Sequence, residues 1–144
     1  MKPKCETLSD EDAQEIDNFF IYGLELLPID HDKQTEEFIV LAIHMLLEAV
    51  LLGEDLPKGV SEEDFCTYMG VVYGEQICLR YGWEWGQIDV QGYQGAGVIS
   101  PSKNSVVFPI PAIYRWSKTT HKNRSLLLYE EIATLQEEKF QVLH

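Results

Sequence analysis

A histidine and two glutamates share one stripe of a helix that the sequence predicts between residues 35 and 52. Glu37, His44 and Glu48 stand seven and four residues apart, and side chains at this spacing lie on one helix face. An imidazole beside a carboxylate can bind a metal ion or form an acid–base pair. Because no further histidine or cysteine stands at ligand spacing, we expect these residues to form the polar edge of a mostly buried helix, with no metal and no other cofactor.

A carboxylate and two tryptophans form the most characteristic candidate site. Glu75 is predicted in the middle of a helix, and Trp83 and Trp85 follow it on one face of a strand. Tryptophans so placed pack in a core or form a binding platform. A buried carboxylate is either catalytic or held in an ion pair, and we expect the ion pair. The cations available to it are Arg80, Arg115 and Lys118.

Residues 103–124 form the only basic run of the chain. No acid occurs between Asp89 and Glu130. The run contains Lys103, Arg115, Lys118, Lys122 and Arg124. It could bind an anion, or it could pair with acids inside the fold or across a dimer. We favour pairing, because the overall negative charge opposes an anionic ligand.

Motifs for nucleophilic or nucleotide chemistry are absent from the sequence. There is no Gly-x-Ser-x-Gly and no phosphate loop. The glycine-rich stretch 92–97 falls inside a predicted hairpin, whereas a dinucleotide site needs it between a strand and a helix. The three cysteines are Cys5, Cys66 and Cys78. Their odd number and the lack of a CxxC pair predict free thiols.

The elements that would position these residues follow from periodicity and capping signals. Helical spacing follows Ser9, Thr35 and Ser61, each a residue type that caps a helix start. The three predicted helices end near Leu27, Leu52 and Tyr81. Period-two patterns then predict the strands 83–90, 93–99 and 105–110, whose short connections imply an antiparallel meander. Two helices, 112–118 and 125 to about 142, complete a single α+β domain covering residues 1–144.

Two of the predicted helices carry further information. The helix 35–52 is apolar on nearly all sides, which is typical of a central helix with neighbours around it. In the helix 62–81, Gly70 and Gly74 lie four residues apart on one face. Glycine costs about 1 kcal/mol relative to alanine within a helix. The pair therefore predicts that another element presses closely against this face.

The negative charge of the chain is confined to its first 64 residues. They hold 17 acids and 4 lysines, a net of −13, whereas residues 65–144 hold 7 acids and 7 bases. Eight of the 17 acids fall in the first turns of predicted helices, where the helix dipole favours them. The other nine need a different explanation, and a basic partner provides one, because net charge governs association more than fold.

Composition and charge also exclude several classes of function. Nucleic acids and anionic membranes require a cationic surface, so we expect neither as a partner. The longest apolar stretch, 38–52, is interrupted by His44 and Glu48 and is too short to cross a bilayer. The first residues turn acidic at once, unlike a signal peptide. These features predict a cytoplasmic protein.

Four short features fall between Tyr68 and about Ile132. They are Gly74-Glu75 in a helix, Trp83 or Trp85, Phe108-Pro109 at the end of a strand, and Arg115 in a basic helix. With them the stretch resembles a family of small bacterial domains of unassigned function, which implies no catalytic residue. In size and charge alone, the chain is also similar to the immunity proteins that neutralise interbacterial toxins, which are small, acidic and cytoplasmic.

Three functional hypotheses follow. The first is a non-enzymatic immunity protein or inhibitor that grips a basic partner, such as a nuclease-like toxin, through acids between its helices. These acids are Asp30, Asp32, Glu54 and Asp55. The second is a small ligand-binding domain or enzyme. Its site would be centred on Glu75, Trp83, Trp85 and the basic segment 103–124, which contributes Arg115. The third is a homodimer or larger homo-oligomer with a structural role.

Overall fold

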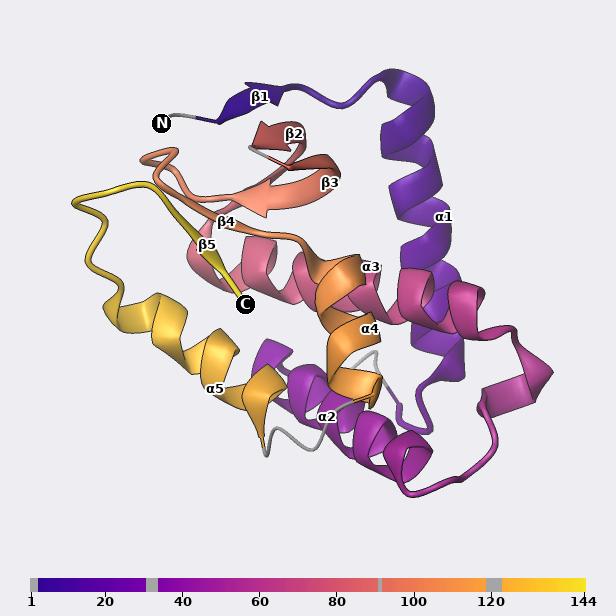
Figure 1. Ribbon diagram of the computed structural model, residues 1–144. Coiled ribbons are helices and arrows are strands. Elements are labelled where there is room, and N and C mark those ends of the chain that lie inside the picture. The colour runs from indigo at the N-terminus through magenta and orange to yellow at the C-terminus, as the bar shows by residue number, and fades with distance from the viewer. Residues whose placement is uncertain (1–2, 31–33, 91, 119–122) are drawn as a thin grey trace.

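The computed structural model describes residues 3–30, 34–90, 92–118 and 123–144. A β-sheet lies at one end of the molecule, with α3 beneath it, the other helices beyond and α1 along one side (Figure 1). This arrangement confirms the predicted α+β class. The elements in chain order are β1 (Lys4–Glu6), α1 (Asp10–Leu26), α2 (Glu36–Leu51), α3 (Glu62–Tyr81), β2 (Glu84–Val90), β3 (Tyr93–Ile99), β4 (Ser105–Val107), α4 (Pro109–Lys118), α5 (Arg124–Glu131) and β5 (Gln141–Leu143).

The first three helices begin where the capping signals predict. The hydroxyls of Ser9, Thr35 and Ser61 each accept a hydrogen bond from the backbone N–H three residues further on, over 3.1, 3.3 and 3.1 Å. Such a bond satisfies one of the free N–H groups at a helix start. Helix α3 ends at Gly82, which adopts the left-handed conformation with φ 73°, as glycine commonly does at this position.

Within the described residues the sheet contains five strands, two more than the sequence predicted. Their order is β1-β2-β3-β4-β5, in which the first four are antiparallel neighbours and β5 runs parallel to β4. The predicted meander forms the middle of the sheet, but its third strand ends at Val107 and not at residue 110, because α4 begins at Pro109, three residues before the predicted helix start. Each additional strand is only three residues long and comes from one end of the chain, so neither carries enough residues to display a period of two.

The last predicted helix is much shorter than the apolar spacing implied. Helix α5 ends at Glu131, and after a 3₁₀ turn at Ile132–Thr134 the chain becomes extended. It then enters the sheet, where the backbone N–H of Gln141 donates a 2.8 Å hydrogen bond to the carbonyl of Asn104. Phe140 and Val142 pack against a small apolar cluster of the sheet. Tertiary contacts therefore override the helical propensity of this segment.

Helix α3, and not α2, is the central helix. It packs against α1, α2, α4 and the strands β2 and β3, and its residues Met69, Val72, Tyr73 and Ile77 are fully buried. Contrary to the prediction, α2 lies on the outside of the molecule (Figure 1). Its apolar residues on the far side from α3 therefore face solvent.

The glycine pair of α3 marks close packing, as predicted. A Cβ at Gly70 would lie 2.7 Å from the Cα of Ile110, in the first turn of α4. A Cβ at Gly74 would lie 2.5 Å from the indole of Trp85 and 2.9 Å from the ring of Pro109. Real Cβ atoms do not approach other atoms this closely. The two glycines therefore allow α4 and Trp85 to rest directly on the backbone of α3.

Candidate protein-binding surface

Three large apolar side chains on the exposed side of α2 and a fourth at the residue just after its end lie in one line, with Glu48 between the last two. Phe38, Leu41, Met45 and Leu52, here called the apolar stripe, are 41, 40, 61 and 86 % exposed. The opposite side of the helix buries Val40, Ile43 and Leu47 against the core. Single exposed apolar residues are ordinary on a protein surface, whereas a continuous group on one helix marks an interaction site.

The spacing of the stripe was a signal present in the sequence. Its members, with Glu48 between the last two, stand at positions 38, 41, 45, 48 and 52, so the intervals alternate between three and four residues. This is the a/d spacing of a coiled-coil helix. The stripe was not predicted as a site, because apolar residues on all sides of a helix are typical of a buried helix.

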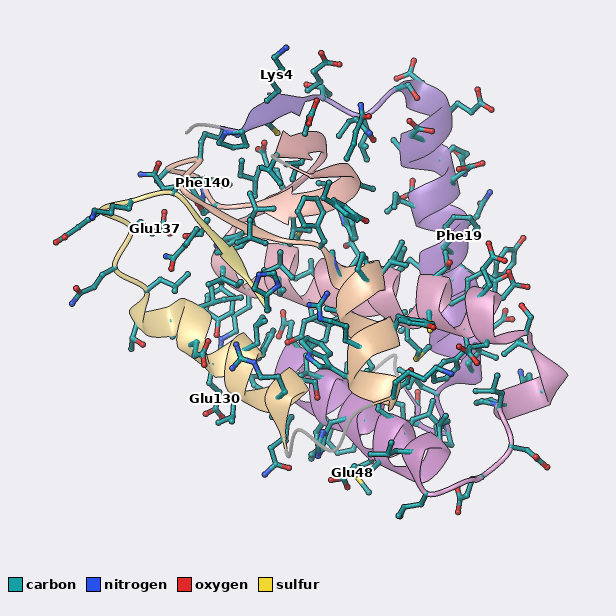
Figure 2. The ribbon with its side chains drawn as sticks, in the orientation of Figure 1. Lys4, Phe19, Glu48, Glu130, Glu137 and Phe140 are labelled. Carbon is teal, nitrogen blue, oxygen red and sulfur yellow. The ribbon has the colours of Figure 1, made fainter. Side chains whose placement is uncertain are left out.

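The described acids that were predicted to bind a partner lie in two loops. Glu54 and Asp55 are exposed in the loop just after Leu52, at the end of the apolar stripe. Asp30 is exposed in the loop between α1 and α2. Asp32 lies outside the residues that the structure describes. Glu48 adds a further carboxylate within the stripe, with 58 % of its side chain exposed, and Figure 2 shows it at the lower margin of the molecule.

Helix α1 adds the largest group of exposed acids. None of its 17 residues is basic. Its acids are Asp10, Glu11, Asp12, Glu15, Asp17 and Glu25, all exposed. Among the described residues none of the six has an ion-pair partner. The acidic half therefore presents most of its charge to solvent.

His44 and Glu48, which were expected at the polar edge of their helix, contact each other, and the contacts continue into the core. His44 Nε2 lies 3.2 Å from Glu48 Oε1, and His44 Nδ1 lies 3.1 Å from Ser125 Oγ. A serine that contacts a histidine, which in turn contacts a carboxylate, resembles a hydrolytic triad. Here, however, Ser125 is 2 % exposed whereas the carboxylate is at the surface, so a substrate could reach the acid but not the nucleophile. The chain of contacts joins α2 to α5.

Glu75 and Trp85 meet, although not through the predicted ion pair. The indole Nε1 of Trp85 donates a 2.9 Å hydrogen bond to Glu75 Oε1. Burial raises the pKa of Glu75, the Trp85 hydrogen bond opposes this increase, and Asp17 reinforces it. Of the predicted cations, Arg80 pairs with Glu37 and Lys118 with Glu62. These two cations therefore stabilise contacts between α3 and its neighbours α2 and α4.

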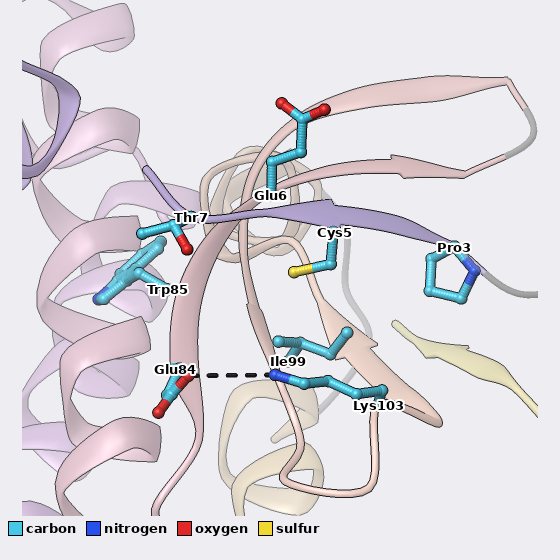
Figure 3. A pocket seen from close by; sticks show the side chains of 8 residues that line it. All are labelled: Pro3, Cys5, Glu6, Thr7, Glu84, Trp85, Ile99 and Lys103. Carbon is cyan, nitrogen blue, oxygen red and sulfur yellow. Dashed lines mark ion pairs between the residues drawn. The ribbon is translucent and has the colours of Figure 1, made fainter. Parts of the chain in front are cut away.

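The other members of the proposed ligand site are dispersed. Trp83 is 5 % exposed and belongs to the main core. Trp85 lines a pocket of about 280 Å³ between the N-terminal strand and the start of β2, where Lys103 Nζ lies 4.0 Å from Glu84 Oε2 (Figure 3). Arg115 lines a different groove, of about 630 Å³, between α3 and α4. The structure therefore does not unite these residues around one cavity.

The basic segment is largely engaged inside the chain. Arg124 Nη1 lies 2.7 Å from Glu131 Oε1, and its Nε donates a 2.6 Å hydrogen bond to the carbonyl of His144. Lys118 Nζ lies 2.8 Å from Glu62 Oε1. Lys122 lies outside the described residues. The observed pairs agree with our preference for internal pairing over anion binding.

The described residues show neither a cluster of metal ligands nor a membrane-spanning helix, and the chain has no match among known proteins. In the described part of the chain, no three histidine, cysteine, aspartate or glutamate side chains gather as a metal would require. No helix within those ranges is long and apolar enough to cross a membrane. Comparisons with protein-family models, with curated proteins and with solved structures found nothing similar to this chain.

Proposed function

We propose that this protein is a non-enzymatic binding protein that neutralises a basic protein partner, in the manner of an immunity protein acting on a toxin in the cytoplasm. The observation that carries the proposal is the acidity of the first 64 residues, which lies largely at the surface wherever the structure describes them. Eight of these acids were predicted in the first turns of helices, where the helix dipole stabilises a negative charge. Among the others, Glu15, Asp17, Glu25, Glu54 and Asp55 are exposed and have no ion-pair partner among the described residues, which fits an external cation.

Charge of this kind acts mainly on the rate of encounter. A surface of one sign attracts an oppositely charged partner from beyond contact distance and can raise the association rate by factors of 10 to 1,000. The attraction extends over roughly 8–10 Å at physiological salt. Exposed acids in the loops after α1 and α2 are suitably placed for this steering.

A nuclease-like toxin is the partner class that this charge fits best. An enzyme that acts on nucleic acid must carry a cationic substrate site, and an acidic protein can cover that site. The alternative of an enzyme or small-ligand domain has less support, because Trp83 is in the core and Trp85 and Arg115 line different cavities.

The test is a pair of experiments on the product of the neighbouring gene. Expression of that product alone should arrest growth, and co-expression with this protein should restore it. Association measured by stopped flow at low salt should slow at least tenfold when Asp30, Glu54 and Asp55 are all changed to lysine. The matched control is the triple change of Asp89, Glu130 and Glu138 to lysine, which alters net charge equally on exposed positions outside the acidic half.

Equal on-rates for the two triple variants would overturn the electrostatic proposal. An adjacent product that is harmless, or one that remains toxic on co-expression, would overturn the immunity function.

A further inference from the structure

We propose that the apolar stripe of α2 receives an amphipathic, lysine- or arginine-rich helix of the partner, packed lengthwise along α2. This inference rests on the proposed function and specifies how the partner is held. It joins two observations, the stripe from Phe38 to Leu52, which the described parts of the chain leave exposed, and the run of acids that accompanies it.

The geometry of the stripe matches a helix better than any other shape. Alternating intervals of three and four residues keep the exposed side chains in line along α2. Leu52 follows Phe38 by 14 residues, which corresponds to a length of about 21 Å at 1.5 Å per residue of helix. A helix of about four turns, with apolar residues at the same spacing, covers that length and inserts its side chains between those of the stripe.

The charge around the stripe selects a cationic helix. Between residues 34 and 57 the chain has no lysine or arginine. The same stretch contains the acids Glu36, Glu37, Glu48, Glu54 and Asp55, of which Glu37 is paired with Arg80. A second copy of this chain would bring a second set of acids against the first, and an anionic lipid surface would be repelled in the same way.

Glu48 fixes the position of the incoming helix. It stands between Met45 and Leu52 in the line of the stripe, and its contact with His44 Nε2 at 3.2 Å holds it in place. A carboxylate covered by an apolar helix would lose its hydration without compensation. A lysine or arginine at the facing position removes that penalty, and a single polar position of this kind defines the register of paired helices.

The probe is a synthetic 21-residue peptide with leucine at every a and d position except one, which is lysine, and with lysine at the flanking positions. Its control is a scrambled peptide of the same composition and charge. Fluorescence anisotropy at 150 mM salt should give a Kd at least tenfold lower for the amphipathic peptide. Met45→Asn should abolish this difference. Leu79→Asn should preserve it, because Leu79 on α3 has the same exposed fraction of 61 %.

Each contrary outcome separates this inference from the proposed function. Equal binding of both peptides, or equal effects of Met45→Asn and Leu79→Asn, would overturn the helix-docking inference while leaving the charge-steered function intact. Stripe-dependent binding that is unchanged in 1 M salt and after reversal of Asp30, Glu54 and Asp55 would preserve docking but contradict the role of charge in both proposals. A dimer in light scattering that Met45→Asn dissociates would assign the stripe to a second copy of the chain.

Discussion

The indole of Trp85 donates its N–H to the carboxylate of Glu75, over 2.9 Å, and so ties strand β2 to the middle of helix α3. Gly74 lies under the same indole, where a side chain would displace the ring. The carboxylate is half-buried. Its burial raises the pKa of Glu75 more than the Trp85 hydrogen bond lowers it. The contact therefore positions Trp85, but it keeps the Glu75 carboxylate partly desolvated, which destabilises its charged form.

Replacing Glu75 with glutamine should stabilise the protein at neutral pH. Because the pKa of Glu75 is raised in the folded state, that state holds the proton more strongly than the unfolded chain, and stability falls as pH rises from the ordinary carboxyl pKa to the raised value. Glutamine has no charge to desolvate, and its carbonyl oxygen accepts the Trp85 hydrogen bond. Thermal unfolding at pH 7 should show a higher Tm for Glu75→Gln.

The pH dependence is the critical part of this prediction. The difference in Tm should shrink on acidification and vanish below the ordinary carboxyl pKa, where Glu75 is protonated in both states. Glu138→Gln, at an exposed position, controls for the loss of one negative charge. A Glu75→Gln variant that is less stable at pH 7, or whose advantage grows in acid, would contradict the dominance of burial.

Alanine at either glycine of α3 should destabilise the protein, although alanine is the better helix former by about 1 kcal/mol. Overpacking of a core costs roughly 1–3 kcal/mol. A Cβ at Gly74 meets side chains, those of Trp85 and Pro109, whereas a Cβ at Gly70 also meets the backbone nitrogen and Cα of Ile110. Backbone yields less readily than side chains. Urea denaturation should therefore give the larger loss for Gly70→Ala, and a gain in stability at either position would contradict the observed close packing.

The contact between His44 and Ser125 should behave as a buried structural hydrogen bond. Ser125→Ala leaves the imidazole Nδ1 without its partner in the core, which should cost about 1–3 kcal/mol. The hydrogen bond of Tyr73 to the Ser125 carbonyl, at 2.6 Å, involves only the backbone of Ser125 and should persist. Glu48→Gln, at the exposed end of the same chain of contacts, should cost less than about 1 kcal/mol.

A double-mutant cycle distinguishes this role from independent packing. Adding His44→Leu to Ser125→Ala removes both polar partners, so the double variant should lose less stability than the sum of the two single changes. Denaturation of the four proteins in urea gives the coupling. Additive losses would show that the two side chains do not depend on each other.

The starts of the first three helices were predictable because each depends on a local rule. A hydroxyl at Ser9, Thr35 or Ser61 satisfies its own helix, and Gly82 supplies the left-handed residue that ends α3. The glycine pair was informative for a similar reason, since its cost within a helix requires compensation by packing. Such signals need no knowledge of distant contacts.

The two edge strands and the position of α2 could not be predicted in this way. Cys5 pairs with Ile88 and Val142 with Val106, residues far away in sequence. Nothing within three residues predicts such a pairing. For α2, composition alone cannot distinguish a helix that its own chain buries on all sides from one with an exposed apolar side, because the two cases differ in where α3, α4 and α5 pack.

Amide hydrogen exchange should distinguish the observed C-terminal segment from the helix that its sequence favours. The N–H of Gln141 is bonded to the carbonyl of Asn104 and should exchange slowly. Glu138 and Lys139 are exposed and have no backbone hydrogen bond from their N–H groups to another described residue, so they should exchange quickly. A helix extending to Val142 would protect all three amides, and uniform protection would contradict the strand.

Reversing one charge on α1 should improve stability and impair association. Glu11 and Glu15 lie four residues apart on the exposed side of a helix without any basic residue. Glu15→Lys replaces their repulsion with a favourable pair, which should raise the free energy of unfolding by about 0.4–1 kcal/mol.

If the acids of α1 serve a basic partner, the same variant should slow association at low salt. The gain in stability should decline in 1 M NaCl because salt screens exposed charges. A gain independent of salt would point to packing, and a variant that is more stable and associates at the original rate would show that α1 does not contribute to steering.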